Sequence, residues 1–140
     1  MIGRRYRLPM ARTMLDEADG LTVADVTHSR ITVFSGSATV GELREWFAVK
    51  ESHRLALLAD DGRYVGSLVA DDIAADADPG RPARELARSR PTVAPGDPAR
   101  RGEKLALSTP ARRVPVVDDA GRLVGIVAIT PDLQGFCGTG

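Results

Sequence analysis

Aromatic residues and cysteine are scarce in this chain. Aromatics make up 4% of its 140 residues, against 43% hydrophobic residues in total, so a core has to be built from Val, Leu, Ile and Ala. The one cysteine, Cys137, cannot form an internal disulfide, and this argues against a disulfide-stabilised secreted scaffold. A chain of this length fits one domain or two closely packed subdomains.

An excess of charge and a long apolar run are also missing. The 19 basic and 19 acidic residues balance, which argues against nucleic-acid binding through an overall basic field. No apolar run approaches the roughly 18 residues of a membrane span. Residues 1–12 contain arginines but lack the apolar segment of a secretory signal. We therefore expect a cytoplasmic protein with neither a membrane nor a nucleic acid as partner.

Motifs of catalysis and of metal binding are absent from the sequence. There is no glycine-rich phosphate loop, no nucleophile elbow and no cluster of metal ligands. His53 has no second His or Cys near it in sequence, and His28 is expected to be exposed at the end of a helix. We predict that the protein is not an enzyme and has no catalytic residue, and that it binds no metal and requires no cofactor.

An internal repeat is the main positive feature. The segment Ser-Arg-Ile-Thr-Val at 29–33 recurs as Ser-Arg-Pro-Thr-Val at 89–93. Asp-Asp-Gly-Arg-Tyr-Val-Gly at 60–66 recurs as Asp-Ala-Gly-Arg-Leu-Val-Gly at 119–125. Between these blocks, 53–58 matches 112–117. Three matched blocks in the same order indicate two copies of one structural unit.

Each copy contains the pattern of a β-hairpin. The short apolar runs at 55–58 and 114–117 are typical of strands buried on both faces. Each run is followed by a tight turn with a glycine and then by a second apolar run, at 64–69 and 123–129. Gly66 and Gly125 lie inside these second strands, which indicates close approach of a backbone or a ligand.

A helix is expected before each hairpin. In the first copy it spans 40–47 with Ser37 as its N-cap, and in the second Asp97 is the expected N-cap and Pro98 the first helical residue. Short helices are also expected at 23–26 and 83–87. The chain then divides into an N-terminal segment at 1–21 with a leading helix over 10–18, a first repeat at 22–76, a linker at 77–81 and a second repeat at 82–140.

The order of these elements, with the run R-V-P-V-V-D-D-A-G-R-L-V-G-I-V at 113–127, resembles the CBS domain, the cystathionine-β-synthase repeat. Two repeats in tandem resemble a stand-alone Bateman module, and the match covers about 22–133. The resemblance implies an α/β (α+β) fold of two pseudo-symmetric β-α-β-β-α repeats packed through their sheets. It also implies adenosine-containing ligands in the clefts between the repeats, and a homodimer.

The resemblance assigns ligand-binding roles in the first copy. A Thr near the first short strand contacts the nucleotide in the family, and Thr32 and Thr92 match this position in the two copies. The motif after the last strand ends in an Asp that accepts hydrogen bonds from ribose hydroxyls. Asp72 is at the matching position, although Val69 replaces the hydroxyl residue of the motif. An alternative role for Asp72 is a cap on the helix that follows.

The second copy departs further from the motif. Ala128 replaces the hydroxyl residue, and Asp132 lies one position late. Thr130 is a further candidate contact, although Thr130 followed by Pro131 is typical of an N-cap and the first position of a helix.

Basic pairs precede the core strand of both copies. They are His53-Arg54 and Arg112-Arg113. The resemblance implies contact with ligand phosphates, which arginine favours because its planar fork makes bidentate contacts. Ordinary surface ion pairs are the alternative for Arg54 and Arg113.

Two functions remain open. The first is a regulatory, ligand-sensing module that binds AMP, ADP, ATP or S-adenosylmethionine and signals to a separate effector protein. The second is a degenerate pair that serves as a dimerisation or protein-interaction module without a ligand. The matched Asp72 and the basic pairs favour the first, whereas Val69, Ala128 and the displaced Asp132 favour the second.

Overall fold

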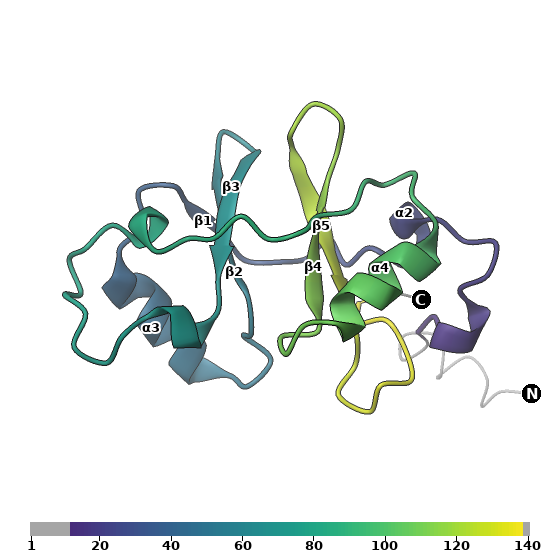
Figure 1. Ribbon diagram of the computed structural model, residues 1–140, viewed down its shortest axis with the longest axis horizontal. Coiled ribbons are helices and arrows are strands. Elements are labelled where there is room, and N and C mark those ends of the chain that lie inside the picture. The colour runs from purple at the N-terminus through teal and green to yellow at the C-terminus, as the bar shows by residue number, and fades with distance from the viewer. Residues whose placement is uncertain (1–11, 139–140) are drawn as a thin grey trace, which may run out of the picture. The chain divides into compact units, whose positions relative to one another are not determined.

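The computed structural model describes residues 12–138, which form two compact units (Figure 1). Unit 1 contains residues 12–31, Thr92–Asp118 and 124–138. Unit 2 contains Thr32–Pro91 and Asp119–Leu123. None of the helices in the described part of the chain has the length and apolar character needed to cross a membrane.

Unit 2 is built on a three-stranded sheet in the order β1-β2-β3. The strands are β1 (Val33–Ser35), β2 (Ala56–Asp60) and β3 (Arg63–Leu68). β1 runs parallel to β2, and β2 pairs antiparallel with β3. The hairpin between β2 and β3 turns through Asp61 and Gly62, both at positive φ (51° and 81°), which confirms the predicted tight turn.

One α-helix and two 3-10 helices complete unit 2. They are α3 (Val40–Val49), η3 (Ala70–Asp72) and η4 (Ala83–Glu85). The N-cap of α3 is Thr39, whose hydroxyl accepts from Glu42 N at 3.3 Å, and the expectation of Ser37 was wrong. The core consists of small and aliphatic side chains, as the scarcity of aromatics predicts: Ala38, Leu43, Ala56, Leu58, Leu68 and Ala83.

Unit 1 contains the second hairpin. Its elements are η2 (Leu15–Glu17), α2 (Val23–Val26), α4 (Ala99–Leu107), β4 (Arg113–Val117) and β5 (Leu123–Ala128), with the first residue of β5 falling in unit 2. β4 and β5 form a two-stranded sheet, and Val93 adds a parallel bridge to Val116 where the first copy has a full strand. Asp97 is not the cap of α4; its carboxylate accepts from Ala94 N at 2.9 Å.

The expected leading helix does not form over the residues that are described. Residues 10 and 11 lie outside them, and only the 3-10 turn Leu15–Glu17 follows. Met14 is extended and bridges to Gly135, and Leu15 N donates to Gln134 O at 2.9 Å. The C-terminal segment thus takes backbone groups that a longer helix would use internally.

The residues that begin each repeat pack in the unit that contains the hairpin of the other repeat. In unit 1, α2 lies against α4 (Figure 1), and Val23 N donates to Asp97 O at 2.7 Å. In unit 2, the equivalent bond runs from Val40 N to Arg81 O at 2.8 Å. Residues 22–31, placed by sequence in the first repeat, therefore belong to unit 1, and 82–91 belong to unit 2.

The same exchange places a backbone segment against the outer edge of each hairpin. His28 bridges to Ile126 beside β5, and Arg88 bridges to Ser67 on β3. Both bridges adjoin the strand glycines. A Cβ on Gly125 would meet His28 O, and a Cβ on Gly66 would meet Ala87 Cβ at 3.1 Å. The predicted close approach of a backbone at both glycines is confirmed.

Candidate ligand site

Asp72 lies at the end of the turn η3 that follows β3 in unit 2. Its Oδ2 accepts from Val69 N at 2.8 Å, so the carboxylate does cap the start of this turn. Two arginines from the segment that pairs with β3 also reach it. Arg88 Nε donates to Oδ1 at 3.0 Å, and Arg90 Nη2 donates to Oδ2 at 2.8 Å. The capping role and a cationic environment coexist at this carboxylate.

The carboxyl group of Asp72 is ionised in these surroundings. Its side chain is only 9% exposed, and burial by itself raises its pKa. The bond from Val69 N, the bond and charge of Arg90 and the bond from Arg88 outweigh burial, so the pKa lies below the ordinary aspartate value. A buried, charged acceptor next to a strand end can receive hydroxyl donors in charge-assisted hydrogen bonds.

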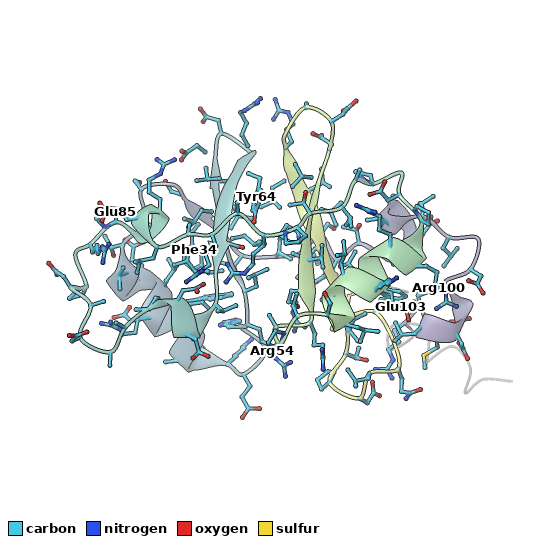
Figure 2. The ribbon with its side chains drawn as sticks, in the orientation of Figure 1. Phe34, Arg54, Tyr64, Glu85, Arg100 and Glu103 are labelled. Atoms are coloured by element: carbon cyan, nitrogen blue, oxygen red, sulfur yellow. The ribbon has the colours of Figure 1, made fainter. Side chains whose placement is uncertain are left out.

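Ser67 and Tyr64 lie on β3 beside this cluster. Ser67 is fully buried, and Arg90 Nη1 donates to its carbonyl oxygen at 2.7 Å. The hydroxyl of Tyr64, labelled in Figure 2, is buried, and burial raises its pKa despite the smaller, opposing effects of Ser67 and Arg90. These polar groups sit on the strand that leads directly into the Asp72 turn.

The first residue of each basic pair binds the end of the preceding helix. His53 Nδ1 bonds to Trp46 O at 2.7 Å, and its ring stacks on the Trp46 indole at 4.1 Å and 5°. Arg112, at a positive φ of 58°, donates from Nη1 to Leu107 O and to Thr109 O. Both side chains satisfy carbonyl groups that a helix C-terminus leaves free.

The second residues of the pairs differ from each other. Arg113 Nη1 lies 3.3 Å from the carbonyl oxygens of Ala111 and Ile129. The side chain of Arg54, half-buried just ahead of β2 (Figure 2), makes no hydrogen bond or ion pair within the described chain. The surface ion pair considered for Arg54 does not form there, and its guanidinium remains available to an anion.

The carboxylate of Asp132 in unit 1 accepts three hydrogen bonds, although its side chain is 53% exposed. It accepts from Arg12 Nη2 at 2.7 Å, from Thr130 Oγ1 at 2.6 Å and from Gln134 N at 3.1 Å. The Thr130 bond, followed by those of Arg12 and Gln134, lowers the pKa of Asp132 to about 2. No helix starts at Pro131. Instead, Thr130 closes a turn in which its hydroxyl also accepts from Gly135 N at 3.1 Å.

The site residues predicted from the two copies of the repeat lie in different units. Thr32, His53, Arg54 and Asp72 lie in unit 2, whereas Thr92, Arg112, Arg113, Thr130 and Asp132 lie in unit 1. Thr32 is exposed and Thr92 half-buried, and neither hydroxyl is hydrogen-bonded within residues 12–138.

Sequence reasoning overlooked Arg88, Arg90 and the setting of His28. The Ser-Arg that opens both copies of the repeat was a usable signal for Arg90. His28 was expected to be exposed, but it is half-buried beside β5. Burial, then the charges of Arg113 and Arg30, lower its pKa.

Comparisons with known proteins agree with this architecture. Residues 83–130 match the CBS domain family, and the search of curated protein sequences gave no match. The structure is similar to that of the CBS-pair protein CBSX2 from Arabidopsis thaliana, with 26% identity and a TM-score of 0.67 over 78% of this chain and 89% of that one.

Two similar structures contain nucleotides. CBSX2 in complex with AMP matches with 27% identity and a TM-score of 0.65, over 78% of this chain and 90% of that one. The cytosolic domain of the Mg²⁺ channel MgtE in complex with ATP matches with 27% identity and a TM-score of 0.61, over 74% of this chain and 44% of that one. Residues 83–130 thus match the CBS-domain family, and the chain has the fold of CBS-pair proteins.

Proposed function

We propose that this chain is a regulatory module that binds an adenine nucleotide and signals to a separate partner protein. The observation that carries the proposal is the ionised, nearly buried carboxylate of Asp72 at the end of the turn after β3. This is the position at which the family resemblance puts the ribose acceptor. The AMP and ATP complexes of the two similar proteins support a nucleotide as the ligand.

Arg54 and Thr32 are the further contacts that we propose in unit 2. A phosphate gains most from a cation that has no protein partner to give up, and the Arg54 guanidinium meets this condition within residues 12–138. The Thr32 hydroxyl precedes β1 and is also unbonded there. His53, bonded to Trp46 O, orients the segment that contains Arg54.

The second-copy residues support a weaker site. A ligand at Asp132 would compete with Arg12, Thr130 and Gln134 for this carboxylate. Arg112 and Arg113 already donate to carbonyl groups. These observations favour one principal nucleotide site, which depends on Asp72. If no nucleotide binds at Asp72 either, the chain is a dimerisation or protein-interaction module.

A thermal-shift panel of AMP, ADP, ATP, S-adenosylmethionine and NAD tests the proposal, because a ligand that binds only the native state raises the melting temperature. Asp72→Ala should weaken the binding of the best ligand by roughly 10- to 100-fold, since a charge-assisted bond to the ribose is lost. Asp71→Ala is the matched control, because Asp71 is the exposed neighbour of Asp72. Equal affinity of wild type and Asp72→Ala would remove Asp72 from the site.

We also propose a cytoplasmic homodimer. Trp46 and Phe47 on α3 pack with Phe34 against the core of unit 2, so these rings are not the contact surface that we propose. Val49, the last residue of α3, is 69% exposed and remains an apolar contact for a second copy. Light scattering at tens of micromolar should report a dimer, and a monomer would contradict this part of the proposal.

A further inference from the structure

The two oxygens of the Asp72 carboxylate are unequally available to a ligand. Oδ2 accepts two hydrogen bonds, from Val69 N and from Arg90 Nη2, both at 2.8 Å. Oδ1 accepts one among the described residues, from Arg88 Nε at 3.0 Å. A carboxylate oxygen offers about two acceptor sites. Oδ2 is therefore filled by the protein, and Oδ1 has a site to spare.

Arg90 is fixed beside Asp72 by a second anchor. Its Nη1 donates to Ser67 O at 2.7 Å and lies 3.3 Å from Ser67 Oγ. The side chain of Arg90 is 22% exposed, and Ser67 is fully buried. Because the guanidinium is a rigid planar fork, holding Nη1 on Ser67 also holds Nη2 on Oδ2. A ligand that took Oδ2 would leave a partly buried cation without its charged partner.

Arg88 is bound far more loosely. Its side chain is 69% exposed and contacts Asp72 through Nε alone. An exposed ion pair of this kind contributes little, because water solvates both groups once they separate. A ligand hydroxyl can therefore join Arg88 at Oδ1, where one acceptor site remains.

We propose that Asp72 binds a nucleotide ribose through Oδ1 alone, and that Arg90 determines this specificity by keeping Oδ2 occupied. The inference rests on the proposed nucleotide function and adds to it. The site recognises one of the two ribose hydroxyls and accepts adenine deoxynucleotides that lack the other. Arg90 acts through Asp72 and is a positioning residue.

Calorimetry with AMP, 2′-deoxy-AMP and 3′-deoxy-AMP tests this on the wild-type chain, with the ATP series used instead if ATP binds more tightly. One deoxy analogue should bind about tenfold more weakly than the parent, and the other within about twofold of it. In Arg90→Ala, Oδ2 becomes available, so both deoxy analogues should bind about tenfold more weakly than the parent.

Arg30→Ala is the matched control. Arg30 occupies the equivalent Ser-Arg position of the first copy, is exposed and forms no hydrogen bond or ion pair in the described residues. The Arg30→Ala substitution removes the same charge as Arg90→Ala, and this variant should keep the wild-type order of affinities for AMP and the two deoxy analogues. If Arg90→Ala fails to fold, as judged by circular dichroism, the wild-type measurements still decide the question.

Three results would overturn the inference. Equal weakening of both deoxy analogues on wild type means that both carboxylate oxygens bind ribose, and the proposed nucleotide function then stands. No weakening of either analogue means that Asp72 does not contact ribose. Absence of binding by both AMP and ATP overturns the nucleotide function itself, together with the inference that rests on it.

Discussion

A Cβ atom placed on Gly125 would lie 2.6 Å from the carbonyl oxygen of His28. That oxygen accepts from Ile126 N at 3.0 Å, so it cannot move without breaking the pairing beside β5. We expect Gly125→Ala to lower the free energy of unfolding by about 1–3 kcal/mol, the usual cost of overpacking. Urea denaturation measures the loss.

Gly66→Ala is the comparison for that variant. A Cβ on Gly66 would meet Ala87 Cβ at 3.1 Å and Arg88 O at 3.4 Å, contacts that a small shift relieves. Its free energy of unfolding should fall less than that of Gly125→Ala. A larger loss at Gly66 would contradict the explanation from backbone approach.

The pKa of His28 gives a pH dependence of stability. Burial, then the charges of Arg113 and Arg30, hold it below the ordinary value, so the unfolded chain binds a proton more readily than the folded one. The contribution of His28 to stability is therefore complete above about pH 6.5 and decreases as the pH falls toward the lowered pKa. NMR titration of the imidazole, assigned with His28→Asn, measures this pKa. Arg30→Ala should raise it, and an unchanged midpoint would exclude the charge effect.

Asp132 should titrate at unusually low pH. Thr130, then Arg12 and Gln134 N, lower its pKa to about 2 in the folded chain. Its stabilising contribution is thus present above the ordinary aspartate pKa of about 3.9 and is lost as the pH falls toward 2. Carboxyl NMR titration should show the pKa of Asp132 rising in Arg12→Ala. The same pKa in wild type and variant would mean that the ion pair does not form in solution.

Arg54 and Arg112 should separate binding from stability. Arg112→Ala removes donors to the carbonyls of Leu107 and Thr109, so the melting temperature without ligand should fall. Arg54→Ala removes a side chain without a partner in the described residues, so the melting temperature should stay the same. Arg54→Ala should weaken ATP more than adenosine, because only ATP has phosphates. Equal losses for the two ligands would exclude the phosphate contact.

Local signals in the sequence were enough to predict the two hairpins. A buried apolar run, a turn with glycine and a second apolar run determine a hairpin among neighbouring residues, and β2–β3 and β4–β5 lie where this pattern puts them. The prediction of a leading helix was wrong because Leu15 N bonds to Gln134 O, a partner far along the chain. Periodicity within a short window carries no information about such a contact.

The candidate site was predictable only in part, for a similar reason. The motif position identifies Asp72, but the arginine that occupies its Oδ2 comes from 18 residues further along the chain. Whether a basic residue is free or bonded depends on which carbonyl groups the fold brings to it. Arg54 and Arg113 occupy equivalent sequence positions, yet Arg113 donates to Ile129 O and Arg54 has no such partner in residues 12–138.

The exchange of leading segments has a mechanical consequence. Residues 12 and 138 both belong to unit 1. The main segment of unit 2, Thr32–Pro91, lies in the sequence between two segments of unit 1. Tension applied through the two ends of the described chain therefore loads unit 1 first. Unit 2 experiences that tension only after unit 1 has opened, so under force the half of the chain with Asp72 is the last to unfold.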